Sequence, residues 1–415
     1  MLNGIHLIDF GNHRNSILTF GRMTALVGQN GAGKTTVMRA IQEIAFLATQ
    51  NVKPTGYLSE FRRRTAKQEW LGASWVSTVP SDKIDHGFTT GTWSGHYRRE
   101  RIPGETKIWI PEQERQVTQA EMEKRNAELW SYLNNLGDGD DTPLKPGSMP
   151  GTVESLEGSI HWNCRYFKTS ASSLQDPAVT DPGRTTLNED GSNLAWALSS
   201  LMTEHPDRFL RIVSALQEVV PIVKRVRSRA VSLTRHEKQT ITVNKQERTF
   251  DEERVVPGQE LIFDMRSGDG LPASMVSEGT LVVLAVLTLI HGSDDADLIM
   301  FDDVELGLHP KAQRDLIRQL RRIQESHPYL QIILSTHSPY VVDEMESEEV
   351  WVFAPDNEGC AVVHRLDQHP NAKRALEVLT TGEFWSAEGE GWVLEELKPP
   401  GSPSAELVAK ASIEK

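Results

Sequence analysis

Residues 28–35 combine glycines, a lysine and a threonine at the spacing that binds the phosphates of a nucleotide. The run reads Gly-Gln-Asn-Gly-Ala-Gly-Lys-Thr and matches G-x-x-x-x-G-K-[ST] at every position. Glycines let the backbone approach a phosphate closely, Lys34 can reach the β- and γ-phosphates, and the Thr35 hydroxyl is a ligand suited to Mg²⁺. The predicted nucleotide-binding residues are Gly28, Asn30, Gly31, Gly33, Lys34, Thr35 and Thr36.

A second set of residues able to do chemistry lies near position 300. Four apolar residues, Leu298–Phe301, precede Asp302 and Asp303, the pattern of a buried parallel strand that ends in carboxylates. Asp302 can accept hydrogen bonds from the water shell of a Mg²⁺ held by Thr35.

His337 follows a further apolar strand, Gln331–Leu334, after a helical pattern over Lys311–Ser326. Strand, helix, strand predicts a parallel crossover, so Asp302 and His337 should emerge at the sheet edge that carries the phosphate loop. There the histidine could bond the γ-phosphate or orient the attacking water.

Ser277 and Gly279 stand where the apolar stretch Leu281–Ile290 begins. Ser277 is a natural helix N-cap, and a helix start directs free N–H groups outward. Taken alone, this pattern is typical of an ordinary capped, buried helix. Its position shortly before Asp302 favours a role in the nucleotide site as well.

Several segments must position these residues. Met23–Val27 reads as the strand before the phosphate loop, and Val37, Ile41, Ile44 and Ala45 recur at helical spacing after it. Apolar spacing over residues 194–220, broken near His205-Pro206, predicts a helical hairpin. We further expect strands over 107–110 and 239–264, a charged helix over 117–135, loops over 136–149 and 174–193, and no sustained heptads.

Composition narrows the class of protein. The chain has 44 basic and 58 acidic residues, a formal net charge of −14, which disfavours a surface coated in basic residues for nucleic acid. Cys164 and Cys360 are the two cysteines, so no disulfide framework is expected. No apolar run is long enough to span a bilayer and the start lacks a signal pattern, so we expect a cytoplasmic protein without membrane contact.

Together these motifs resemble the ABC-type ATPase heads of the RecF, SMC and OLD group. More narrowly, they are similar to stand-alone AAA family ATPases of prokaryotic defence and repair operons, over residues 1–50 and 190–339. The resemblance implies an α/β P-loop NTPase fold: an ABC-type head with a mixed sheet, an inserted helical lobe and no long coiled coil. It makes 28–35 Walker A, 277–280 a variant signature motif, 298–303 Walker B, 308–310 the D-loop region and His337 the switch histidine.

The family mechanism implies a head-to-tail homodimer in which Ser277 and Gly279 of one subunit close on ATP held by the other. The family usually carries Asp-Glu after the Walker B strand, with the glutamate as general base. Here Asp303 takes that place with a shorter side chain, and Glu305 could compensate, so we predict slow ATP hydrolysis with ATP and Mg²⁺ as substrate and cofactor. Gln68, Gln113 and Gln116 are equal candidates for the Q-loop glutamine.

The spacing of the motifs distinguishes this chain from several functional classes of ABC protein. The interval between Lys34 and Ser277 is far longer than in a transporter subunit, and it lacks the heptad arms of an SMC protein. No convincing D-x-D cluster follows His337, so an OLD-type nuclease is not expected; Glu383, Glu388 and Glu390 read as solvated acids. The predicted division is an N-terminal ATPase part (1–115), an inserted helical lobe (116–290), a C-terminal ATPase part (291–395) and a mobile tail (396–415).

Two functions remain open. In the first, the ATPase is the sensor or scaffold of an anti-phage defence system with a separately encoded effector, a nuclease or toxin. Phe384, Trp385 and Trp392 would then be a docking site, or equally a small local core. In the second, it is a RecF-like repair ATPase that binds duplex DNA through basic runs at 62–64, 98–101 and 224–229.

Overall fold

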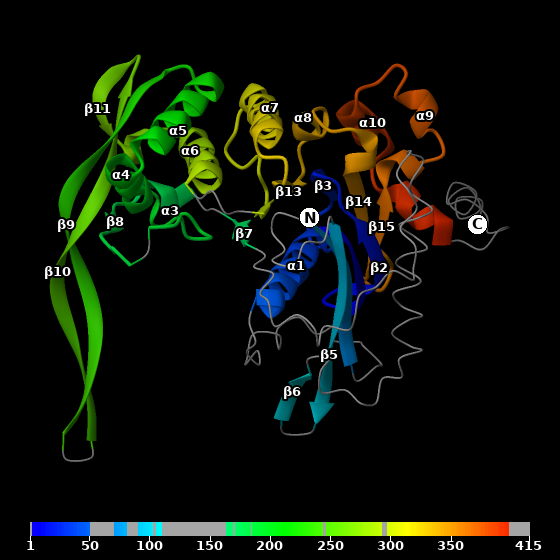
Figure 1. The fold of residues 1–415 in the computed structure, drawn as a ribbon, viewed down its shortest axis with the longest axis horizontal. Helices are drawn as coiled ribbons and strands as arrows, with labels where there is room; N and C mark the ends of the chain where they lie inside the picture. Colours follow the sequence, from blue (N-terminus) through cyan, green and yellow to red (C-terminus); the bar gives the residue numbers. More distant parts are fainter. Residues whose placement is uncertain are drawn as a thin grey trace, which may run out of the picture. The chain divides into compact units, whose positions relative to one another are not determined.

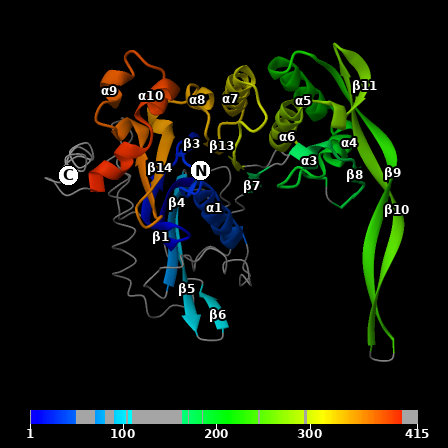
Figure 2. The ribbon, with the colours of Figure 1, turned by 180° about the vertical axis from the view of Figure 1, so that it is seen from behind.

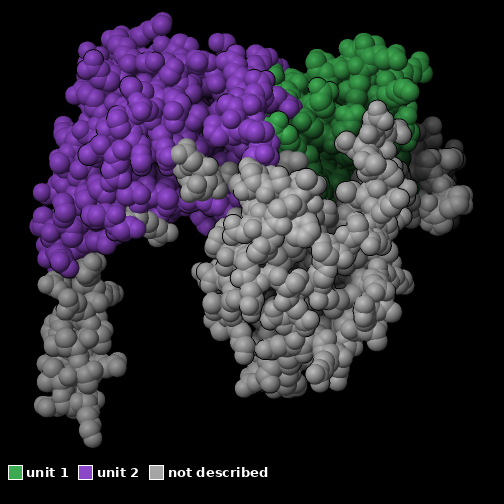
Figure 3. All heavy atoms as spheres, in the orientation of Figure 1, with its two compact units in different colours: residues 1–161, 335–415 green, residues 162–334 purple. Residues whose placement is uncertain are grey.

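The described chain forms two compact units, which Figure 3 draws in different colours. The computed structural model describes residues 2–49, 70–80, 90–102, 105–109, 163–168, 171–183, 185–243, 246–292 and 297–397. One unit comprises residues 1–161 and 335–415, and the other comprises residues 162–334. The predicted division into four segments stays a prediction.

The first unit is built on a mixed sheet with the strand order β6-β5-β4-β1-β2-β15-β14-β3. Its strands are β1 (Leu2–Phe10), β2 (His13–Thr19), β3 (Met23–Gly28), β4 (Trp70–Pro80), β5 (Thr90–Ile102), β6 (Glu105–Trp109), β14 (Val350–Pro355) and β15 (Ala361–Arg365). Every residue of β3 is buried, and β14 lies parallel to it, so the strand that leads into the phosphate loop is in the core.

The first unit also contains α-helices and short 3-10 helices, the latter labelled η. They are α1 (Lys34–Thr49), α8 (Pro339–Val342), η6 (Ser347–Glu349), η7 (Leu366–Gln368), α9 (Ala372–Ala375), α10 (Thr381–Glu388) and η8 (Gly391–Leu397). The α1 helix begins at Lys34, directly after the glycine turn, and contacts β1 and β3. The predicted strand, turn and helix at the phosphate loop are therefore present.

The aromatic residues near the end of this unit form a small local core rather than an exposed docking surface. Phe384, Trp385 and Trp392 are at most 8% exposed. The His369 ring packs edge-on against Phe384 and Trp392, with centroid separations of 5.2 and 4.9 Å.

The second unit contains three short parallel strands in the order β13-β12-β7. They are β7 (Cys164–Phe167), β12 (Leu298–Phe301) and β13 (Gln331–Thr336), the last crossing into the first unit, and α7 (Pro310–Ser326) joins β12 to β13. All residues of β12 and β13 are buried, which explains their continuous apolar sequence. This is the predicted crossover.

The remaining helices of the second unit are α3 (Ala171–Gln175), α4 (Leu194–Glu204), α5 (Pro206–Val219), η5 (Ala273–Met275) and α6 (Glu278–His291). The break between α4 and α5 at His205 confirms the predicted helical pair. Residues 279–290 of α6 are all buried, so α6 is the central helix that its uniformly apolar sequence predicts.

A long antiparallel hairpin pairs β9 (Val223–Val243) with β10 (Gln246–Met265), and β11 (Gly268–Pro272) and β8 (Ala178–Val179) extend that sheet. Figures 1 and 2 show β9 and β10 running well beyond the helices of their own unit. The sequence predicted strands over 239–264 but missed that the first strand begins at Val223.

Cys164 and Cys360 are free thiols. Among the helices of the described ranges, none is both long and apolar enough to cross a membrane. The predicted helix over 117–135, the residues 62–64 and the three candidate Q-loop glutamines lie outside the described residues.

Candidate functional site

The phosphate loop connects β3 to α1 within the first unit. Three of its glycines have positive φ: Gly28 at 136°, Gly31 at 80° and Gly33 at 112°. A side chain at Gly33 would meet the His13 ring at 2.7 Å, and one at Gly28 would meet the Phe353 carbonyl oxygen at 2.2 Å. Glycine is therefore required at positions 28 and 33 both by backbone conformation and by space, and at position 31 by backbone conformation alone.

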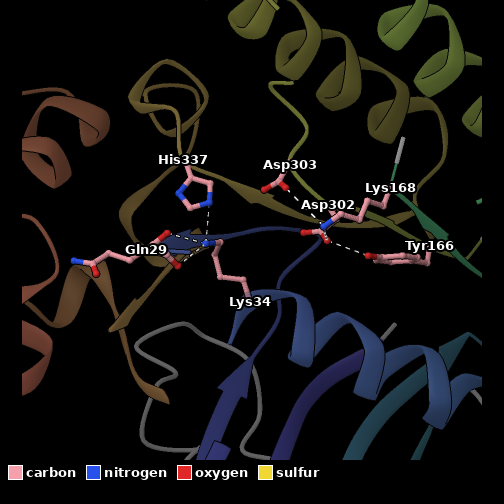
Figure 4. A network of polar contacts seen from close by, with 8 residues as sticks. Gln29, Lys34, Tyr166, Lys168, Asp302, Asp303 and His337 are labelled. Carbon is pink, nitrogen blue, oxygen red and sulfur yellow. Dashed lines mark hydrogen bonds and ion pairs between the residues drawn. The ribbon is translucent and has the colours of Figure 1, made fainter. Parts of the chain in front are cut away.

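Lys34 directs its ammonium into the loop. Nζ donates to the carbonyl oxygens of Gly28 (2.7 Å) and Gln29 (3.0 Å), and it lies 3.0 Å from Nε2 of His337 (Figure 4). An ammonium has donors only, so Nε2 of His337 accepts this bond. The lysine of the loop and the histidine that follows β13 thus meet, as their positions after parallel strands predicted.

Two residues that the sequence did not point to support the loop from the β1–β2 turn. Asn12 Nδ2 donates to the Gly31 carbonyl oxygen at 3.0 Å, and His13 Nε2 lies 3.1 Å from that of Gly33. Burial lowers the pKa of His13 to about 4, so the ring is neutral at pH 7. Nε2 therefore donates to Gly33, and Nδ1 accepts from the Ser16 hydroxyl at 2.8 Å.

The carboxylates predicted to follow Walker B lie in the second unit, at the end of β12. The Asp302 side chain is 1% exposed, whereas that of Asp303 is 38% exposed. Oδ2 of Asp302 accepts from the Tyr166 hydroxyl at 3.0 Å and from Lys168 Nζ at 2.6 Å (Figure 4). Tyr166 and Lys168 were missed because their strand pairing cannot be seen in the sequence.

The turn after β12 is tight. Asp303 has φ 58°, the one positive φ of a non-glycine residue in the described chain, and its carbonyl oxygen accepts from the Leu306 N–H at 3.1 Å. Glu305 lies in the same turn, where its carbonyl oxygen accepts from Leu308 at 2.9 Å. Asp303 and Glu305, the two acids predicted as alternative general bases, thus belong to one short loop.

The predicted signature residues lie at the start of α6, in the same unit. Ser277 occupies the N-cap position without making a capping bond, because its hydroxyl pairs with that of Thr280 at 2.8 Å. A side chain at Gly279 would meet the Gly307 carbonyl oxygen at 2.6 Å, so the helix start touches the turn that follows the acids. The structure brings these two motifs of one chain together.

One of the basic runs predicted to contact DNA, residues 224–229, lies in β9. Two basic residues of β9 pair with acids of the same unit: Arg227 binds Asp264 at 2.7 Å and Arg229 binds Glu260 at 2.5 Å. Arg227 therefore does not offer an unneutralised charge, and duplex DNA binding stays a prediction.

Glu383 accepts from the Thr380 N–H at 3.0 Å in the cap of α10, as a solvated helix acid would. Within the described ranges, no three His, Cys, Asp or Glu side chains gather as metal ligands.

Two family models match parts of the chain, each about a third of it. Residues 5–146 match an AAA domain, and residues 198–343 match the family described as "AAA domain, putative AbiEii toxin, Type IV TA system". The first segment contains the phosphate loop; the second contains the start of α6, the acids after β12 and His337.

Two of the curated relatives with similar sequences carry retron names. The chain is 26% identical over 140 residues to "Retron Vc95 probable ATPase" of Vibrio cholerae serotype O1 biovar El Tor, covering 30% of this chain and 25% of that protein. It is 28% identical over 105 residues to "Retron Ec83 probable ATPase" of Escherichia coli, covering 22% and 19%. The matched segment spans a quarter of these relatives or less.

Among solved structures, the chain resembles an SMC head bound to the C-terminal winged-helix domain of ScpA. The TM-score is 0.50 at 14% identity, covering 91% of this chain and 99% of that one. A likeness at this identity concerns the fold alone.

Proposed function

We propose that this chain, an ABC-type P-loop ATPase with AAA domains, binds ATP with Mg²⁺, dimerises head to tail around it and hydrolyses it slowly. The observation that carries the proposal is the Lys34 ammonium, held by two loop carbonyls and His337 at a complete phosphate loop. An ammonium in this position can exchange those neutral acceptors for phosphate oxygens, which are stronger partners.

The residues that would hold Mg²⁺ are Thr35 and Asp302. Hydroxyl and carboxylate oxygens are the donors Mg²⁺ prefers, and one or two carboxylates suffice when a nucleotide supplies the rest. Asp302 fits a cation, since it already accepts from the Lys168 ammonium at 2.6 Å. When bound, Mg²⁺ neutralises the charge that develops on the transferred phosphoryl group.

Each of the other predicted residues would have its own role in ATP hydrolysis. Asp303, with Glu305 as the alternative, would take the proton of the attacking water while the bond between the γ-phosphorus and ADP breaks. His337 would orient that water or bond the γ-phosphate. Ser277 and Gly279 would come from the partner subunit and close the site.

We further propose that the ATPase is a cytoplasmic sensor or scaffold for a separately encoded effector, a nuclease or toxin, in anti-phage defence. The support is the retron name of the two curated relatives described above and the toxin–antitoxin description of one family model. Only part of each relative is matched, so the role is a proposal for this chain.

A nucleotide-binding assay tests whether the chain binds ATP, and light scattering tests whether it dimerises around ATP. Asp303→Asn protein should bind ATP and become dimeric with ATP and Mg²⁺, because slow turnover retains the nucleotide. Lys34→Met protein should bind no ATP, so its oligomeric state should be the same with and without nucleotide. Equal ATP binding by both variants would contradict the proposal.

Phage challenge of cells carrying the gene with its neighbours tests the defence role. Protection that is lost with Lys34→Met supports it, and equal phage titres with and without the genes contradict it.

A further inference from the structure

Lys168 is brought to the Walker B acids by strand pairing. β7 lies parallel to β12 with Phe167 opposite Phe301, and the Asp302 N–H donates to the Phe167 carbonyl oxygen at 2.9 Å. The next residue of each strand therefore follows at the same edge. Lys168 Nζ lies 2.6 Å from Asp302 Oδ2 and 3.8 Å from Asp303 Oδ2.

The burial of these groups is unequal. The Asp302 side chain is 1% exposed, and a buried carboxylate is costly unless it is paired. The Lys168 side chain is 47% exposed, so its flexible stem has room to place the ammonium in water. The carboxylate is fixed, and its counter-charge is the movable partner.

The charges are also unequal. Lys168 lies within 4 Å of both carboxylates, and one ammonium by itself cannot neutralise two carboxylates, whereas one divalent cation can. Lys168 and the Tyr166 hydroxyl both donate to Oδ2 of Asp302. A hydrated Mg²⁺ at Asp302 would have to share or take that acceptor.

Resting on the proposed ATPase function, we propose that Lys168 is a positioning residue: the resident counter-ion of Asp302 and Asp303, displaced when Mg²⁺ binds. It holds the buried carboxylate in place before the metal arrives and competes with the metal for it. Lys168 thereby sets the Mg²⁺ concentration at which the site loads.

Lys168→Met tests this, because methionine keeps an unbranched stem and removes the charge. The matched control is Lys311→Met, which removes an exposed lysine of α7 that lies 3.6 Å from Asp315. Binding of a fluorescent ATP analogue is followed while Mg²⁺ is titrated at constant ionic strength. A second readout is the thermal midpoint of the protein in EDTA.

Lys168→Met should reach half-saturation at about fivefold lower Mg²⁺, the effect of losing one partly exposed ion pair. Its midpoint in EDTA should fall below that of wild type, because the buried carboxylate has lost its counter-ion. Lys168→Arg should restore both values, and Lys311→Met should change neither. If the methionine variant does not fold, Lys168→Gln is measured with the same expectation.

An unchanged or higher Mg²⁺ requirement in Lys168→Met would overturn the inference. So would weaker analogue binding in EDTA with an unchanged Mg²⁺ titration, which would mean that Lys168 binds phosphate. Failure of the proposed ATPase function is a different result: wild type would not bind the analogue, or Lys34→Met would bind it equally.

Discussion

Asp303 combines a predicted catalytic role with a backbone conformation that most side chains resist. Its φ of 58° lies in the left-handed region, where Asn and Asp are tolerated better than Ala. Asp303→Asn therefore keeps the turn and removes the group that can accept a proton. We expect ATP binding to persist and phosphate release to fall about 10²-fold, the lower end for losing a general base. Phosphate release equal to wild type would rule Asp303 out as the base, and Glu305→Gln would then be the variant to measure.

His13 makes the stability of the first unit depend on pH. Its pKa is lowered to about 4 by burial, whereas the unfolded chain takes up this proton near pH 6.5. Between these values unfolding takes up a proton, so the free energy of unfolding falls as pH drops from about 6.5 to about 4, by at most about 3 kcal/mol.

Denaturant titrations of wild type and His13→Gln across this range check the point. Glutamine can still donate to Gly33 but cannot be protonated, so the variant should show a shallower loss. Some loss will remain, because burial also lowers the pKa of His291 to about 4. Identical slopes for the two proteins would contradict the assignment to His13.

At the scale of elements, the contact between the start of α6 and the turn after β12 is sensitive to a single methyl group. A Cβ at Gly279 would lie 2.6 Å from the Gly307 carbonyl oxygen, a backbone atom that cannot turn away. Gly279→Ala should destabilise the protein by about 1–3 kcal/mol through overpacking, less the gain in helix propensity.

The matched control is Gly268→Ala in β11, where a Cβ would meet nothing within 4 Å. It should stay within about 0.5 kcal/mol of wild type. Thermal midpoints measure both variants. A Gly279→Ala protein as stable as the control would show that the start of α6 and the turn after β12 do not pack as described.

The elements also show how far the sequence alone could go. The α/β ABC-type fold is confirmed by its likeness to an SMC head. It could be predicted because β12, α7 and β13 follow one another in the chain, and the apolar runs of the two strands reflect their complete burial. The beginning of β9 was missed because residues 224–229 were interpreted as a basic run for DNA contact, although Arg225, Arg227 and Arg229 alternate with small or apolar residues as in a strand with one exposed face. Lys168 was missed for another reason: its role arises from the pairing of β7 with β12, which lie far apart in the chain.

At the scale of the whole molecule, the proposed dimer places Lys34 and Ser277 of different subunits at one ATP. Ser277 is exposed, so Ser277→Arg can block this contact without disturbing the core, and Lys34→Met removes the other half. Each variant alone would lack every complete site and should be inactive. In a mixed dimer, one site carries both substitutions and the other carries neither.

Equal mixing should therefore restore about a quarter of the wild-type ATPase rate, since about half of the dimers are mixed and each has one intact site. Phosphate release by each variant and by their mixture, at equal total protein, measures this. Both variants must first match the thermal midpoint of wild type, so that recovery reflects shared sites and not rescue of an unfolded subunit. A mixture no more active than its separate components would mean that each chain uses its own Ser277, and the head-to-tail dimer would have to be abandoned.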